Sequence, residues 1–269
     1  MPEPLRLMCV LAHPDDEALG NGGTLAKYAA EGVETYLVTA TRGERGWQGA
    51  EQDNPGLAAL GAIREAELRD AAAVLGIREL HFLDYIDGDL DQADPTEAIA
   101  KIAAHLRRVK PHVVITFGPA GAYGHTDHIA ICQFTTSACV AAANASYTGA
   151  GDLPPHAVAK LYYLAVPHTL ADAYQAVFGD IVMHFDGVAR TMVVDEDWAI
   201  TTWLDTSAYH DIVWKAIFCH TSQLPAYSAL EQVPEQYQHV IWSEQHYYRA
   251  FSLVNGGRAI ERDLFAGLR

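Results

Sequence analysis

The sequence predicts an α/β protein with a Rossmann-like, doubly wound and mostly parallel sheet that helices cover on both faces. Strand-like apolar runs alternate with helix-like stretches over the first 166 residues. The strand-like runs are continuously apolar, which is typical of parallel strands buried on both faces. The expected strands are Leu5–Leu11, Glu34–Thr39, Glu79–Leu83, Val113–Phe117 and Lys160–Val166. The expected helices span about Glu17–Ala30, Leu60–Leu75, Thr96–Val109 and Asp127–Ala143.

The pattern weakens after residue 166. We therefore expect residues 1–166 to form a Rossmann-like core, and residues 167–269 to form a smaller C-terminal α+β extension that is integrated with this core and completes the fold. The extension contains short β-like pieces at Ile181–Phe185 and Met192–Val194 and a helix at about Ala208–Cys219. Topology rules favour the strand order 3-2-1-4-5 in the core, so that the first and fourth strands lie side by side where ligands bind.

Composition excludes some classes of function. The chain has 269 residues, half of them hydrophobic, which is enough to bury a large core. A formal net charge of −16 argues against nucleic-acid partners and anionic membrane surfaces. The four cysteines show no C-x-x-C pairing, and we expect buried thiols in a reducing compartment. Without a signal-like N-terminus or an apolar segment of about 18 residues, we expect a cytoplasmic protein, with homo-oligomerisation left open.

Two polar clusters follow strands that should be neighbours. Residues 13–17 (H-P-D-D-E) follow the first strand, and residues 124–128 (G-H-T-D-H) follow the fourth. Packed carboxylates repel one another and lose hydration unless a cation or a catalytic task compensates them. Taken singly, Asp15 or Asp16 could cap a helix, and His125 and His128 could be surface histidines. Together, the two clusters predict one metal centre. A dinucleotide site is the weaker alternative, because residues 20–23 (G-N-G-G) do not match G-x-G-x-x-G and lie inside a helix.

The combination of A-H-P-D-D-E at residues 12–17 with G-H-x-D-H at residues 124–128 resembles the PIG-L/LmbE family of zinc-dependent N-deacetylases, which act on N-acetylglucosaminyl compounds and related amides. The resemblance covers roughly Leu5–Asn144, and residues 215–223 match a further K-x-x-x-x-H-x-S-Q element. It implies that His13, Asp16 and His128 bind Zn²⁺, or another divalent ion such as Fe²⁺, with open positions for water and the substrate carbonyl.

The remaining residues of the two clusters are candidates for proton transfer. Asp15 is a spare carboxylate placed to take a proton from the metal-bound water. By resemblance, His125 donates to the tetrahedral intermediate and the leaving amine, Asp127 orients its imidazole, and Tyr123 hydrogen-bonds the oxyanion. We expect Asp127 to raise the pKa of His125, although a nearby zinc ion opposes this, and we expect a bell-shaped pH profile.

Three further residues are candidates for substrate binding. Glu44 and Arg64 resemble family residues that line the sugar pocket, and His220 could reach the pocket from the C-terminal helix. The alternatives are a surface ion pair for Arg64 and a helix-end histidine for His220. Tyr123 has a similar alternative as a loop aromatic.

The sequence thus predicts a zinc-dependent hydrolase that removes an acyl group, most simply acetyl, from a small N-acetylglucosaminyl-type amide by metal-activated water. No G-x-S-x-G serine-hydrolase motif occurs. An amidase that cleaves a larger thiol-sugar conjugate is one alternative. A catalytically silent metal- and ligand-binding protein is another, although Asp15 and His125 argue against it, because a binding site needs no base or acid.

Overall fold

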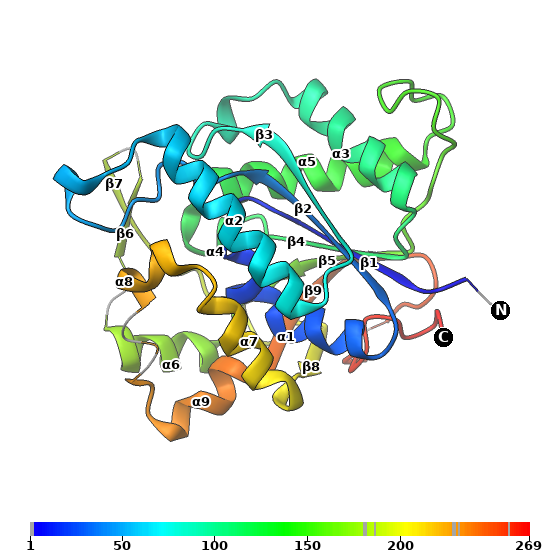
Figure 1. Cartoon of the computed structure of the whole chain (residues 1–269). Helices are drawn as coiled ribbons and strands as arrows, with labels where there is room; N and C mark the ends of the chain where they lie inside the picture. The colour runs from blue at the N-terminus through cyan, green and yellow to red at the C-terminus, as the bar shows by residue number, and fades with distance from the viewer. Residues whose placement is uncertain (1–2, 180–181, 186, 228–229, 231, 258) are drawn as a thin grey trace.

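The computed structural model describes residues 3–179, 182–185, 187–227, 230, 232–257 and 259–269, and a seven-stranded sheet lies at its centre (Figure 1). The strands of this sheet are β1 (Arg6–Leu11), β2 (Glu34–Thr41), β3 (Glu79–Tyr85), β4 (Val113–Thr116), β5 (Lys160–Leu164), β8 (Thr202–Asp205) and β9 (Glu244–Ser252). A separate hairpin consists of β6 (Val182–Phe185) and β7 (Val188–Thr191). The helices are α1 (Asp16–Ala30), α2 (Leu57–Leu75), α3 (Pro95–Val109), α4 (Gly121–Gly124), α5 (Thr126–Ala143), α6 (His168–Phe178), α7 (His210–Ile217), α8 (Leu224–Tyr227) and α9 (Glu235–Trp242).

The strand order is β3-β2-β1-β4-β5-β9-β8, which confirms the expected doubly wound α/β core and its 3-2-1-4-5 order. The first five strands are parallel, and β1 lies between β2 and β4. Strand β9 joins β5 in the antiparallel direction, and β8 joins β9 in the same way. Two strands from the C-terminal third therefore extend the core sheet.

Helices cover both faces of the sheet. Helix α3 packs against α5 on one face, and α1, α2 and α7 pack together on the other (Figure 1). The glycine-rich run at residues 20–23 lies in α1, where a Cβ on Gly23 would be only 2.6 Å from the Thr206 side chain. These glycines allow close packing of α1 against the C-terminal third, so the dinucleotide alternative has no support from them.

Most differences between the expected and observed elements lie in the C-terminal third. The expected strand at Met192–Val194 is wrong, because the hairpin strand β7 ends at Thr191. Residue 181 of the other β-like piece lies outside the described residues, whereas its remainder forms β6. The expected helix at Ala208–Cys219 is shorter and is preceded by a 3₁₀ turn, Ser207–Tyr209. Strands β8 and β9 were not expected.

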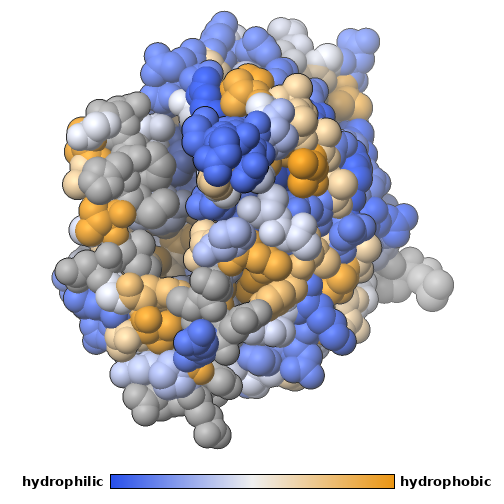
Figure 2. Space-filling model, turned by 60° about the vertical axis from the view of Figure 1, so that its left-hand side comes forward, coloured by the Kyte–Doolittle hydropathy of each residue, from blue (hydrophilic) through white to orange (hydrophobic). Residues whose placement is uncertain are grey.

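The cysteines are mostly buried, as expected from the sequence, and the surface is mixed in polarity. Three of the four free cysteines are buried, and Cys219 is partly exposed. Burial raises the pKa of Cys139 to about 12, so this thiol stays protonated and unreactive. On the face shown in Figure 2, apolar residues form separate patches among hydrophilic ones. None of the helices in the described ranges is long and apolar enough to cross a bilayer.

Candidate metal centre and active site

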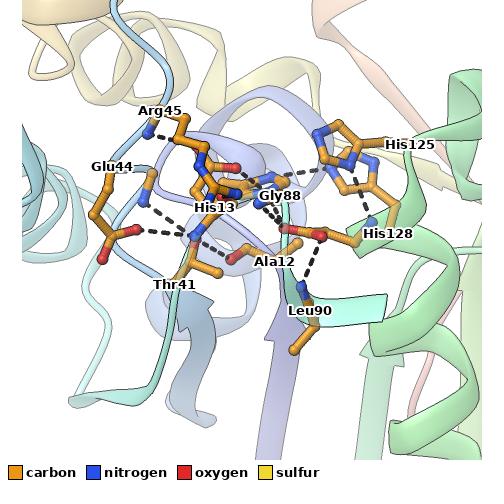
Figure 3. Close-up of polar contacts among 12 residues, drawn as sticks. Ala12, His13, Thr41, Glu44, Arg45, Gly88, Leu90, His125 and His128 are labelled. Atoms are coloured by element: carbon orange, nitrogen blue, oxygen red, sulfur yellow. Dashed lines mark hydrogen bonds and ion pairs between the residues drawn. The ribbon is translucent and has the colours of Figure 1, made fainter. Parts of the chain in front are cut away.

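The site lies where the loops after β1 and β4 meet. These two strands are hydrogen-bonded neighbours, with Leu7 opposite Val113, so their carboxyl ends bring residues 12–16 and residues 117–128 together. Helix α1 begins at Asp16, and helix α5 begins at Thr126. Figure 3 shows His13 lying close to His125 and His128. The sheet topology thus brings the two predicted clusters into one site.

Three side chains form a donor set that fits a metal ion. The Nδ1 atom of His13 is 3.2 Å from Nε2 of His128 and 3.8 Å from Oδ2 of Asp16. The Nε2 atom of His128 is 3.5 Å from Oδ1 of Asp16. Ligand atoms bound to zinc at about 2.0–2.1 Å in tetrahedral geometry lie roughly 3.3–3.4 Å apart. The two histidine atoms are 3.2 Å apart, close to that value, and a different oxygen of the Asp16 carboxylate faces each of them. The residue types and their arrangement therefore fit a zinc-like ion.

Neighbouring groups hold each of these ligands in place. The Nδ1 atom of His128 lies 3.3 Å from the Gly121 carbonyl oxygen, which leaves Nε2 directed at the site, and the ring stacks on Phe117 at 3.7 Å between centroids. The Oδ2 atom of Asp16 accepts from the backbone N–H of Ala12 and His13 at 3.1 and 2.8 Å. Such outer contacts fix the orientation of metal ligands.

Burial and neighbouring charges shift the pKa values of His128 and Asp16 in opposite directions. Burial and the nearby His13 and His125 lower the pKa of His128 well below its usual value, so this ring is neutral and could bind a cation through Nε2. Burial raises the pKa of Asp16 to about 7, against the attraction of His13 and with a contribution from Asp15. A divalent cation would compensate the crowded negative charge that contributes to this shift.

The carboxylate of Asp127 contacts His13, which was not expected. Its Oδ2 atom is 3.1 Å from Nε2 of His13 and accepts from the Gly88 N–H at 2.7 Å, while Oδ1 accepts from the Leu90 N–H at 3.1 Å. Burial lowers the pKa of His13, but hydrogen bonds to Asp127 and Asp87 hold it well above its usual value. The carboxylate of Asp127 therefore orients the ring of His13, and the backbone N–H of Asp127 donates to His125.

The predicted pKa of His125 is also wrong in direction. Its Nδ1 atom accepts the backbone N–H of Asp127 at 3.1 Å, and its ring lies 4.7 Å from those of His13 and His128. Burial and the charge of His13 lower the pKa of His125 to about 4, against the opposite effect of Asp127. The ring is therefore neutral, and with Nδ1 as the acceptor its proton is on Nε2.

Tyr123 lies beside the two histidines of its loop. Its ring centroid is 5.3 Å from that of His128 and 6.1 Å from that of His125. Burial raises the pKa of Tyr123, and the charges of Asp16 and Asp15 raise it further. The phenol therefore keeps its proton and can act as a hydrogen-bond donor.

One carboxylate oxygen of Asp15 accepts hydrogen bonds from two side chains. Its Oδ2 atom accepts from Arg64 Nη2 at 3.1 Å and from the Tyr227 hydroxyl at 2.5 Å. Arg64 is buried and also donates to the carbonyl oxygens of Pro14 and Gly43. A Cβ on Gly43 would collide with the Arg64 guanidinium, so glycine is needed there. Arg64 thus forms a buried ion pair with Asp15 and not a surface one.

Two other predicted substrate residues have structural partners. Glu44 is buried and accepts the backbone N–H of Asp87 at 3.1 Å, which fixes the loop after β3. The His220 side chain is fully buried, with Nε2 2.7 Å from Oε1 of Glu17. A side chain without exposed surface cannot contact a substrate, so the expected binding role of His220 is wrong.

Sequence reasoning missed three residues of the site. Asp87 lies 3.1 Å from Nε2 of His13, and its position shortly after a strand is the same signal that marked the two clusters. Tyr227 comes from α8 in the C-terminal third, where no local pattern indicated a site. Phe117 was assigned only to a strand, and its stacking on His128 requires the tertiary structure.

Comparisons with known proteins identify the family and support the fold. The family model described as GlcNAc-PI de-N-acetylase, PIG-L, matches residues 8–139. A 1D-myo-inositol 2-acetamido-2-deoxy-alpha-D-glucopyranoside deacetylase of Kineococcus radiotolerans is 33% identical over 99% of this chain and 84% of its own. A mycothiol S-conjugate amidase of Streptomyces coelicolor is 29% identical over 100% of this chain and 99% of its own. The structure of an N,N'-diacetylchitobiose deacetylase from Pyrococcus horikoshii superposes with a TM-score of 0.68 and 19% identity, over 91% of this chain and 83% of that one, which supports the fold.

Proposed function

The chain belongs to the PIG-L family, and on this premise we propose that this hydrolytic N-deacetylase uses a divalent metal ion, Zn²⁺ in the first instance, to remove an acetyl group from an N-acetylglucosaminyl-type small molecule. The observation that carries the proposal is the convergence of His13 Nδ1, His128 Nε2 and the Asp16 carboxylate, whose pairwise distances are 3.2–3.8 Å. Three protein ligands with an open position are the arrangement of hydrolytic zinc sites.

The chain's own residues supply the remaining chemistry. A metal ion bound by His13, Asp16 and His128 would acidify water and polarise the acyl carbonyl. Asp15 takes the proton of the attacking water and passes it to the leaving amine, since it precedes Asp16 in the loop and its carboxylate is held by Arg64 and Tyr227. The neutral His125 donates its Nε2–H to the developing oxyanion, and the Tyr123 hydroxyl is a second donor. This role for His125 replaces the imidazolium acid expected from the sequence.

The substrate class follows from the relatives. The Kineococcus relative is named for an acetylglucosaminyl-inositol, and the Pyrococcus structure for diacetylchitobiose; both compounds carry an N-acetylated glucosamine. The second candidate is an amidase for a larger thiol-sugar conjugate, which the 29% identity to the Streptomyces amidase over the full chain favours. A deacetylase of an acetamido sugar and an amidase both cleave an amide bond, so one catalytic arrangement serves either.

A substrate panel separates the two candidates. The zinc-loaded protein is incubated with the acetylglucosaminyl-inositol, with diacetylchitobiose and with a mycothiol S-conjugate, and the freed amine and acetate are measured. We expect acetate from the acetylated sugars, and none after metal removal by a chelator. Faster release of amine from the S-conjugate would favour the amidase, while release from none of the three by the metal-loaded protein would refute both candidates.

A further inference from the structure

Asp15 adopts an unusual backbone conformation. Its φ and ψ angles are 102° and −27°, in the left-handed region that residues other than glycine rarely adopt. Although Asp15 is the N-cap residue of α1, its side chain makes no capping hydrogen bond; its Oδ2 atom instead meets Arg64 and Tyr227. The strained backbone thus directs the carboxylate away from the helix terminus that it would ordinarily cap.

Glu17 compensates this conformation. Its Oε2 atom accepts the backbone N–H of Asp15 at 2.9 Å, from position N2 of the helix, one residue before the acidic position of a capping box. Its Oε1 atom lies 2.7 Å from Nε2 of His220. The side chains of Glu17 and His220 are both fully buried. Each oxygen of Glu17 therefore has a definite partner, and neither is directed at the metal ligands.

The segment that carries His220 is itself anchored at several points. Glu67 of α2 accepts from the Thr221 hydroxyl, the Ser222 N–H and the Ser222 hydroxyl at 2.6–2.7 Å. The Gln223 side-chain amide donates to the Gly46 carbonyl oxygen at 2.9 Å. His220 is thus held by contacts that do not involve α1, so it gives Glu17 a fixed partner.

We propose that Glu17 and His220 are positioning residues that hold Asp15 in the conformation in which its carboxylate can take the proton of the attacking water. The proposal rests on the proposed function, in which Asp15 is the base. It gives the K-x-x-x-x-H-x-S-Q element at residues 215–223 a role in catalysis without contact with the substrate. Because a buried carboxylate that loses its partner rearranges to find another, removal of His220 should release the Asp15 N–H.

The test compares His220→Leu with His220→Gln. Leucine removes the donor, whereas the glutamine amide can still donate to Glu17. We expect kcat to fall about 10–100-fold in His220→Leu, with KM and zinc content within about twofold of wild type, and His220→Gln to recover most of the loss. Hydrogen exchange of the Asp15 amide, followed by NMR on the metal-free protein, should be faster in His220→Leu than in wild type. This readout does not depend on activity.

A second buried histidine supplies the matched control. His246 in β9 is paired with Glu244 at 3.4 Å and packs on Trp203, away from Asp15. His246→Leu should lower the free energy of unfolding about as much as His220→Leu does. Its kcat and the hydrogen exchange of its Asp15 amide should equal those of wild type. If His220→Leu does not fold, Glu17→Gln takes its place. The substitution turns one of the two accepting oxygens into an NH₂ group, which cannot accept from His220 or from the Asp15 N–H. We then expect the same loss of kcat.

The outcomes separate the proposal from the proposed function. Suppose that the wild type is active and that His220→Leu, or Glu17→Gln in its place, has near-normal kcat and Asp15 amide exchange. This result would overturn the positioning role alone. The same conclusion follows if the His246→Leu control loses as much kcat. A wild type that is inactive on every sugar tested, with faster Asp15 exchange in the variant, would refute the proposed function while supporting the hydrogen-bonded pair.

Discussion

Replacing Asp127 with asparagine should weaken metal binding and not merely slow the reaction. The two carboxylate oxygens serve His13 Nε2 and the backbone N–H groups of Gly88 and Leu90. The side-chain oxygen of asparagine can keep the hydrogen bonds to His13 and Gly88. The NH₂ group of asparagine would then face the Leu90 N–H. One buried donor loses its acceptor, which costs about 1–3 kcal/mol of the free energy of unfolding.

The same substitution makes the partner of His13 a weaker acceptor. Changes in such outer contacts typically lower metal affinity about 10–100-fold, which corresponds to roughly 1.4–2.7 kcal/mol of binding free energy. Zinc affinity is measured by competition with a chromophoric chelator, and stability by urea unfolding of the metal-free protein. Asp89→Asn is the control, because Asp89 pairs with Arg45 on the exposed side of the same loop. Unchanged zinc affinity with a reduced kcat in Asp127→Asn would refute the assignment and restore the expected role of Asp127 beside His125.

His128→Ala should lose most of its zinc, since a three-ligand site depends on each ligand; full retention in a metal analysis would contradict this. Asp15→Asn should keep zinc and lower kcat about 10²–10⁴-fold, and near-normal steady-state turnover would refute its role as base. Burial raises the pKa of Glu261, but hydrogen bonds from Lys160 and Tyr162 outweigh this effect and lower the pKa from 4.5 to about 2. Its contribution to the free energy of unfolding, about 3 kcal/mol, is therefore complete above about pH 4.5 and is lost as the pH falls towards 2. The stability difference between wild type and Glu261→Gln in urea unfolding should shrink over that range, and a constant difference would be inconsistent with the shift.

The predicted part of the site is local in the sequence. His13, Asp15 and Asp16 share one loop after a continuously apolar strand, and that strand pattern predicts the parallel core. The topology rule then places the fourth strand beside the first, which brings His128 to them. Such a site can be inferred without tertiary contacts, because each step uses a pattern within a few residues or a general rule of chain connection.

The role of Asp127 could not be inferred in this way. His125 is the N-cap residue of α5, with extended backbone angles, whereas Asp127 lies in the first turn of the helix. Residues two positions apart across a helix start direct their side chains differently, so proximity in the sequence did not imply contact between the side chains. The outcome depends on the loop after β3, which supplies the N–H groups of Gly88 and Leu90.

That loop also links metal binding to the fold as a whole. Strand β3 lies two positions from β1 in the sheet, with β2 between them, yet Asp87 and Gly88 reach the contacts around His13. The path is fixed by Glu44, which follows β2 and accepts the Asp87 N–H. Carboxyl ends of four neighbouring strands thus contribute to one ligand environment. Because His13 is oriented only when these strands are paired, metal binding should stabilise the native sheet, and the gain should increase with metal concentration as ligand linkage requires.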